Sequence, residues 1–231
     1  MMFELRKANE RGSANFGWLN AKHTFSFGHY YDVNHMGFGP LRVINEDRIK
    51  PEGGFATHSH ENMEILTVVL SGAIAHKDSM GQSEKLVPGE YQLMSAGAGV
   101  QHSEFNPSSN EELHLLQIWI QPNVFNGEPS YQQKPFPQEQ GFVDIATPTA
   151  SGGSFLIKQN AVIKQLILEP NTQQSLSIEL GKKVFVQSIN DGLSVGEREL
   201  SSGDGLKITQ ESELLFSNNS SEKVKAIVFI M

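Results

Sequence analysis

The sequence predicts an all-β protein built from two similar halves, and three observations support this fold class. Short apolar or alternating runs are separated by clusters of Gly, Pro, Asn, Asp and Ser at intervals of about 8 to 12 residues, as in β-sandwiches and barrels. No amphipathic pattern extends beyond about two helical turns. A strand-like run, a glycine turn and a second strand-like run follow one another at 69–74 and again at 187–195, which indicates a weak internal repeat.

The expected strands follow the chain in two groups separated by an irregular segment. In the first half they are 41–44, 63–70, 72–76, 90–95 and 113–120. In the second half they are 155–158, 162–168, 184–189, 206–208, 213–216 and 224–230. Between the groups, 122–154 carries five of the ten prolines together with several glycines, and is expected to be a linker or an irregular crossing segment.

Composition excludes several classes of protein. The chain has 231 residues and a formal net charge of −8, and no Lys/Arg-rich run is present, so we expect no direct binding to nucleic acid. The absence of cysteine excludes disulfides, thiolate metal ligands and cysteine nucleophiles. Residues 1–11 are charged without an apolar signal segment, and the most apolar stretch, 113–120, is far shorter than a bilayer span. We therefore expect a cytoplasmic protein with no membrane partner.

Two pairs of metal-competent side chains are spaced two residues apart. They are His58 with His60, and His102 with Glu104. Residues two apart in a β-strand point to the same face, so each pair offers two ligands on one side of a sheet. If the two strands are neighbours, three imidazoles and a carboxylate converge on one metal ion. We expect the other five histidines not to be ligands: His23, His29, His35, His76 and His114.

Glycines precede both pairs, at Gly53-Gly54 and at Gly97-Ala98-Gly99. A residue without Cβ lets another backbone approach closely, as a crowded metal site requires.

These residues resemble the motifs of a known family. Gly54-Phe55-Ala56-Thr57-His58-Ser59-His60 resembles the first cupin motif, and Gly99-Val100-Gln101-His102-Ser103-Glu104-Phe105-Asn106 resembles the second. The combination His-x-His and His-x-Glu is similar to pirins, and so are Gly17-Trp18-Leu19, His23-Thr24-Phe25-Ser26-Phe27 and Met36-Gly37-Phe38-Gly39. The resemblance is strong from about residue 5 to 122 and then fades. Ser13, Phe16 and the proline-free 95–97 depart from the pattern without touching a ligand position.

The resemblance implies two cupin, jelly-roll-like β-barrels packed face to face. Residues 1–125 would form the metal-binding barrel, and 126–231 a degenerate barrel without ligands, including the Pro/Gly-rich connection. His58, His60, His102 and Glu104 fall on the pirin ligand positions. Glu64, which matches the carboxylate ligand of many other cupins, is then expected to be a structural acid or to support the ligands.

The implied chemistry is metal-dependent oxygenation. Three imidazoles and a carboxylate suit several divalent ions; an octahedral Fe(II) would keep two positions open for substrate and dioxygen, and Mn, Ni, Cu and Zn are the alternatives. Bacterial pirins are associated with quercetin 2,3-dioxygenase activity, in which dioxygen opens the flavonol ring and carbon monoxide and a depside are released. Glu104 would accept the proton of the flavonol 3-hydroxyl. The aromatic substrate would enter a mouth lined by Phe25, Phe27, Phe38, Phe55 and Met63.

Two other functions remain open at this point. In one, the metal is a redox sensor in a non-enzymatic co-regulator that binds a partner protein, as animal pirins suggest. In the other, the same chemistry acts on a different hydroxylated metabolite. In the enzymatic case the partners are a small aromatic molecule and O2, and the chain is expected to be a monomer.

Overall fold

The computed structural model describes residues 2–231, apart from the side chain of Met2, and it is almost entirely β. Backbone contacts divide it into two units. The N-terminal unit consists of Gly12–Phe136 and Ile157–Gln159, and the C-terminal unit of Pro137–Leu156, Asn160–Met231 and the described part of Met1–Arg11. The all-β prediction is confirmed.

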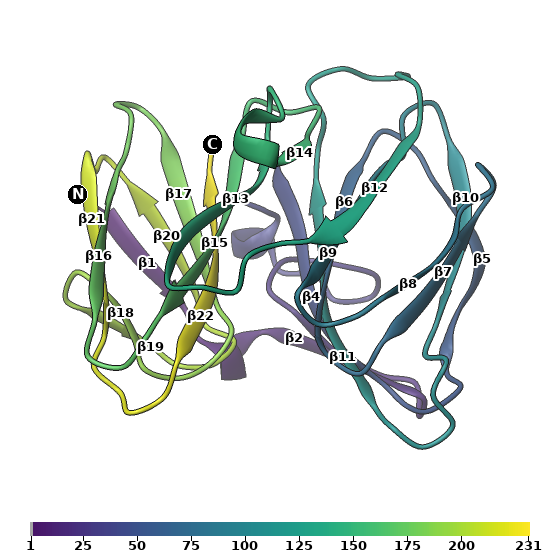
Figure 1. The fold of residues 1–231 in the computed structure, drawn as a ribbon, viewed down its shortest axis with the longest axis horizontal. Coiled ribbons are helices and arrows are strands. Elements are labelled where there is room, and N and C mark those ends of the chain that lie inside the picture. Colours follow the sequence, from purple (N-terminus) through teal and green to yellow (C-terminus); the bar gives the residue numbers. More distant parts are fainter. Residues whose placement is uncertain (1) are drawn as a thin grey trace. The chain divides into compact units, whose positions relative to one another are not determined.

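Two sheets form the N-terminal unit (Figure 1). The four-stranded sheet has the order β5 (Gly54–His60), β10 (Val100–Phe105), β7 (Ile74–Asp78) and β8 (Ser83–Leu86). The seven-stranded sheet has the order β12 (Ser130–Pro135), β9 (Glu90–Ser95), β6 (Glu64–Ser71), β11 (Leu113–Ile120), β4 (Leu41–Ile49), β3 (Leu19–His23) and β2 (Gly12–Asn15). The two sheets stand opposite each other, so side chains on their inner faces share one interior.

The C-terminal unit repeats this plan of one seven-stranded and one four-stranded sheet. Its seven-stranded sheet has the order β1 (Met2–Arg6), β20 (Gly205–Thr209), β17 (Lys183–Ser188), β22 (Val224–Ile230), β15 (Val162–Leu168), β13 (Gly141–Thr147) and β14 (Phe155–Leu156). Its four-stranded sheet has the order β16 (Gln173–Ser177), β21 (Glu213–Asn218), β18 (Leu193–Val195) and β19 (Arg198–Leu200). The predicted internal repeat is therefore confirmed. Each unit contains two separate sheets, as a jelly-roll-like barrel does, so the predicted fold class of two cupin domains is confirmed, and neither barrel closes into a single sheet.

The segment 122–154 was expected to lack regular structure, and this expectation is wrong. It contains β12, which pairs with β9, and β13, which pairs with β15. The strand β12 has a polar sequence and lies at the edge of its sheet, so it shows no apolar alternation. Its proline, Pro135, is tolerated because β12 is an edge strand.

The contact-based units also differ from the expected division between residues 125 and 126. The N-terminal strand β1 belongs to the C-terminal unit, because it pairs with β20. Residues up to Phe136 belong to the N-terminal unit, because β12 extends its seven-stranded sheet. Three short 3-10 helices complete the described structure: η1 (Ala8–Glu10), η2 (Val33–His35) and η3 (Ser151–Gly153).

Within residues 2–231, no helix has the length and apolar character needed to cross a membrane.

The pairing of β5 with β10 positions the predicted ligands. The register is antiparallel, with His102 opposite His58 and Val100 opposite His60, and a bulge interrupts it between His102 and Glu104. Gly54 lies where the backbones come closest: a Cβ there would be 2.3 Å from the carbonyl oxygen of Glu104. The expectation that glycine permits close backbone approach beside the site is thus confirmed for Gly54.

We predict that Gly54→Ala lowers the free energy of unfolding by about 1–3 kcal/mol, because the added methyl group forces β5 away from β10. Urea denaturation of both proteins measures the change. Gly127→Ala is the matched control, since the nearest atom to its Cβ is Nζ of Lys158 at 3.9 Å. Equal stability of the Gly54 variant and the wild type would show that the two strands do not need this close contact.

Candidate metal centre

The strand β10 carries its site residues on one face. Val100, His102 and Glu104 are buried, whereas Gln101 and Phe105 between and beyond them are exposed. This alternation is the two-residue period of a strand with one face against the interior. His102 and Glu104 are each only 1% exposed, so both polar side chains lie in an environment that demands partners.

The rings of His58 and His102 face each other through their Nε2 atoms. Nδ1 of His58 lies 2.8 Å from the carbonyl oxygen of Ala56, so in the neutral ring this nitrogen donates and Nε2 keeps its lone pair. Nε2 of His58 lies 3.0 Å from Nε2 of His102. The orientation of His102 therefore decides whether these two atoms hydrogen-bond or repel.

A buried pair behind His102 decides its orientation. Nε2 of His76 lies 3.1 Å from Oδ2 of Asp78, and a carboxylate only accepts, so Nε2 of His76 carries the proton. Burial lowers the pKa of His76, partly offset by Asp78, which leaves the ring neutral with Nδ1 as an acceptor. Nδ1 of His76 accepts from Nε2 of Gln92 at 3.3 Å, and Nδ1 of His102, at 3.5 Å, is placed to share that acceptor. In the His102 tautomer that donates to His76, Nε2 of His102 also keeps its lone pair, and two lone pairs meet across 3.0 Å.

His60 completes a group of three imidazoles. Its ring lies edge to face with those of His58 and His102, each at 4.8 Å between centroids, and against Trp119 at 4.9 Å. Nε2 of His60 is buried and has no hydrogen-bond partner among the described residues. Burial, and then the charge of His58, lower the pKa of His60 to about 4. Burial, followed by the three neighbouring histidines, lowers the pKa of His102 to about 2. These rings are neutral at pH 7, as metal ligation requires.

Glu104 is held beside His102 by one of its two oxygens. Oε2 accepts a hydrogen bond of 2.8 Å from Nε2 of Gln117, whose Oε1 in turn accepts one of 3.2 Å from Nε1 of Trp119. Oε1 of Glu104 is buried without a hydrogen-bond partner among the described residues. Burial raises the pKa of Glu104 to about 7, although the bond from Gln117 opposes the shift. One oxygen is therefore left to bind a proton or a cation.

The four predicted ligands fall into two overlapping groups. Ligand atoms of His58, His60 and His102 all lie within 4.8 Å of one another. Glu104 forms a second such group with His102 and His76, and not with His58 and His60. His102 is common to both groups. The lone pairs converge in the first group, whereas Nε2 of His76 is occupied by Asp78.

The other acid considered for the site lies elsewhere. Glu64 is 1% exposed, and its Oε2 accepts hydrogen bonds from Oγ of Ser95 at 2.8 Å and from the backbone N–H of Lys158 at 3.1 Å. It thereby ties 157–159 to β6. Of the remaining histidines, His114 pairs with Glu46 and His35 lies 3.9 Å from Asp32, both outside the two groups.

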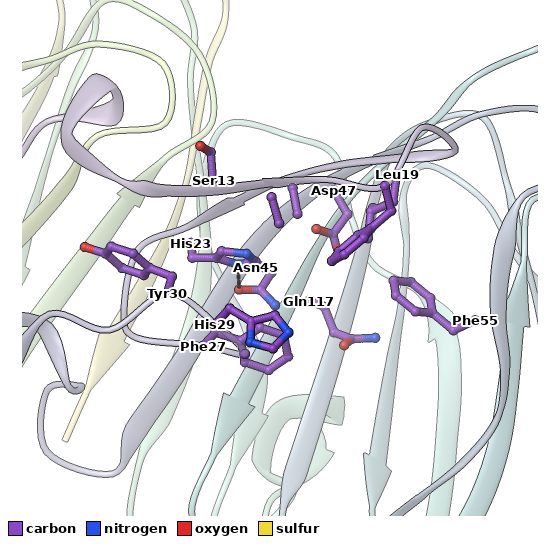
Figure 2. Close-up of a pocket in the computed structure, with 14 residues that line it drawn as sticks. Ser13, Leu19, His23, Phe27, His29, Tyr30, Asn45, Asp47, Phe55 and Gln117 are labelled. Carbon is purple, nitrogen blue, oxygen red and sulfur yellow. Dashed lines mark hydrogen bonds between the residues drawn. The ribbon is translucent and has the colours of Figure 1, made fainter.

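A cavity of about 400 Å³ lies in the N-terminal unit (Figure 2). Most of its wall is apolar, and two of the five expected aromatic and methionine residues, Phe27 and Phe55, line it. Gln117 lies in its wall and donates to Glu104, which connects the cavity to the site. The volume is in the range of roughly 300–1,000 Å³ found for small-molecule pockets. The other lining residues are Ser13, Ala14, Phe16, Leu19, Ala21, His23, Gly28, His29, Tyr30, Asn45 and Asp47.

Sequence reasoning missed three residues around this centre: His76, Gln117 and Asp47. The spacing of His76 and Asp78 repeats the two-residue pattern of the ligand pairs, and this signal could have indicated them. Asp47 and Gln117 carry no such local signal. Burial raises the pKa of Asp47 to about 7, with further contributions from the charges of Glu104 and Glu46.

Comparison with known proteins bears out the resemblance seen in the motifs. Residues 4–120 match the Pirin family, and 144–231 match the family described as the quercetinase C-terminal cupin domain. A protein of Escherichia coli K12 named quercetin 2,3-dioxygenase is 45% identical over 223 residues, which cover 96% of each chain. A pirin-like protein of Caulobacter vibrioides is 36% identical over 215 residues, 91% of this chain and 92% of the relative.

Solved structures agree with the sequence comparisons. The crystal structure of the bacterial pirin YhhW from Escherichia coli in complex with nickel(II) has a TM-score of 0.96 and 43% identity, covering 100% of this chain and 99% of that one. A second crystal structure of YhhW has a TM-score of 0.97 and the same identity, covering 100% and 97%. The chain thus belongs to the pirin family, with two cupin-type domains in the order that its motifs and its repeated sheets indicate.

Proposed function

We propose that this protein is a metal-dependent dioxygenase of the quercetin 2,3-dioxygenase type, with one divalent ion held by His58, His60, His102 and Glu104. The observation that carries the proposal is the pair of Nε2 lone pairs facing across 3.0 Å, with the unpartnered Nε2 of His60 beside them. Two such nitrogens, each about 2.1 Å from one shared ion and at right angles to each other, would be about 3.0 Å apart.

The donor set fits a divalent ion that leaves room for reactants. Imidazole nitrogens with a carboxylate oxygen suit Fe, Mn, Ni, Cu and Zn, and exclude a preference for soft ions. We propose Fe(II), since two open positions beside four protein ligands accommodate a substrate oxygen and O2. Nickel(II) in the Escherichia coli relative YhhW supports a divalent ion without favouring iron.

The proposed substrate is a flavonol or a similar hydroxylated aromatic molecule. Phe27 and Phe55 in the cavity wall suit a planar ring system. Gln117, which lines the same cavity, donates to the proposed ligand Glu104. When bound, the ion supplies Lewis acidity that lowers the pKa of the substrate hydroxyl. Oε1 of Glu104 has no protein partner; it would hold the ion with one lone pair and accept the released proton with the other. Both atoms of O2 enter the product, and one ring carbon leaves as carbon monoxide.

The setting proposed for this reaction is the cytoplasm, with the chain acting as a monomer. The absence of cysteine suits a reducing compartment. A surface with net charge −8 and no basic run supports a small-molecule substrate over a nucleic acid.

The test of this function is carbon monoxide release from quercetin under air. The protein is stripped of metal and reloaded anaerobically with one divalent ion at a time. Turnover with one ion identifies the cofactor. Stoichiometric loading without carbon monoxide, for every ion, would overturn the dioxygenase proposal and favour a redox sensor or another substrate.

We predict that His58→Ala lowers metal affinity and carbon monoxide release together. Removal of a residue that only supports a ligand costs about 10- to 100-fold in affinity, and loss of a ligand is expected to cost at least that much. Competition with a chelator measures the affinity. His35→Ala is the control, because His35 lies outside both ligand groups. Full occupancy in the His58 variant would remove His58 from the ligand set.

Glu104→Gln is expected to keep the fold and part of the metal but to lose flavonol turnover by about 100-fold or more, because the amide cannot accept the hydroxyl proton. Circular dichroism, metal analysis and the carbon monoxide assay separate these effects. Glu64→Gln removes an equally buried carboxyl away from the site and serves as the control. Undiminished turnover in the Glu104 variant would exclude it as the base.

Asp78→Asn tests the orientation of His102. An amide can donate to Nε2 of His76, which would shift the His76 proton to Nδ1 and leave His102 without its acceptor. We predict a fall in metal affinity of about 10- to 100-fold. Glu46→Gln, which alters the similar pair between Glu46 and His114, is the matched control. Equal affinity in the two variants would show that the Asp78–His76 pair does not orient the ligand.

A further inference from the structure

A buried carboxyl in the cavity wall has no function in the proposed reaction. Asp47 is 3% exposed and lines the cavity, and its Oδ1 has no hydrogen-bond partner among the described residues. A buried acceptor without a partner destabilises the fold, and more so when it is charged. Such a cost is offset if a ligand in the cavity supplies the missing donor.

The strand register fixes the position of Asp47 relative to Gln117, the wall residue that donates to Glu104. In the pairing of β4 with β11, Asn45 lies opposite Gln117 and Asp47 lies opposite Leu115. Figure 2 shows Asp47, Asn45 and Gln117 along one wall, with Phe55 to one side and Phe27 to the other. Gln117 and Asp47 line the same cavity, and Gln117 donates to Glu104, so one wall residue links the carboxyl of Asp47 to the predicted ligand group.

Neighbouring polar groups in the wall already have partners. Oδ1 of Asn45 lies 2.8 Å from Nδ1 of His23, and both Nε2 and Oε1 of Gln117 are engaged. No Lys or Arg lines the cavity in the described part of the chain, so no cation there neutralises Asp47. A ligand that brings a hydrogen-bond donor to the free Oδ1 of Asp47 is therefore favoured, and a neutral hydroxyl group is such a donor.

We propose that Asp47 is a specificity-determining residue that accepts a hydrogen bond from a second hydroxyl group of the substrate, remote from the hydroxyl at the ion. The ligand class is then a neutral aromatic molecule with at least two hydroxyl groups. The inference rests on the proposed function, because the first hydroxyl is taken to bind the metal. It goes beyond that function by assigning the group that separates polyhydroxylated from singly hydroxylated substrates.

The experiment measures binding without turnover. The protein is loaded with nickel(II) under nitrogen, and the dissociation constants of quercetin and 3-hydroxyflavone are obtained from quenching of tryptophan fluorescence. Both probes carry the hydroxyl that would reach the ion, but 3-hydroxyflavone has no second hydroxyl. We compare the wild type with Asp47→Ala, and with Asp47→Asn, which keeps the size of the side chain and protects the comparison if the alanine variant folds poorly.

We expect Asp47→Ala to weaken quercetin binding by about 10- to 100-fold while 3-hydroxyflavone changes by less than about twofold, because only quercetin donates to Asp47. Asp47→Asn is expected to weaken quercetin binding in the same selective way but less, since its amide oxygen still accepts. The control Glu112→Gln removes a half-exposed carboxyl that pairs with Arg48 and does not line the cavity, and it should change neither constant.

The outcomes separate this inference from the proposed function. Equal weakening of both flavonols in the Asp47 variants would show that Asp47 acts through the ion or the fold, and would overturn the assignment. Unchanged quercetin binding would overturn it as well. A wild-type protein that binds neither flavonol would instead overturn the proposed function, and this inference with it.

Discussion

The interior of the N-terminal unit is arranged around one close contact, between Nε2 of His58 and Nε2 of His102. Each ring is turned by a partner behind it, a backbone carbonyl for His58 and His76 for His102. The register of β5 and β10 brings the rings opposite each other, and Gly54 permits the close approach of the two backbones. Left alone, this arrangement is unfavourable, since buried polar atoms without partners cost free energy. A cation held between the rings, as proposed, would turn the same arrangement into a stabilising one.

The C-terminal unit shows that the scaffold does not itself require polar side chains inside. Its strands β16 and β21 hold the places that β5 and β10 hold in the N-terminal unit. There, Leu176, Leu214 and Phe216 are buried in one apolar cluster with the inner residues of the larger sheet. All eight histidines lie in the other unit. One sheet plan thus supports either an apolar core or a ligand group, and the difference lies in a few inward positions.

The parts of this site that sequence reasoning could predict are those that lie within one strand. A two-residue spacing places both side chains of a pair on one face of a strand, which is why the sequence indicates the pairs His58 with His60 and His102 with Glu104. Asp47 and Gln117 depend on which strands become neighbours, and β4 pairs with β11 across a long stretch of chain. Strand β12 was missed for a related reason: at the edge of a sheet it needs no apolar alternation, and only its pairing with β9 defines it.

The two sheets contribute different polar side chains to the interior, and together these side chains suit a hydroxylated ligand. The four-stranded sheet supplies the predicted ligands His58, His60, His102 and Glu104, whereas the seven-stranded sheet supplies Gln117 and Asp47. Because Trp119 donates to the oxygen of Gln117, the amide nitrogen of Gln117 must point to Glu104, which fixes the carboxyl oxygen that stays free. Glu104 and Asp47 therefore each keep one acceptor oxygen for something other than protein. An interior with two such acceptors, and no basic side chain in the described cavity wall, is complementary to a neutral molecule that donates hydrogen bonds.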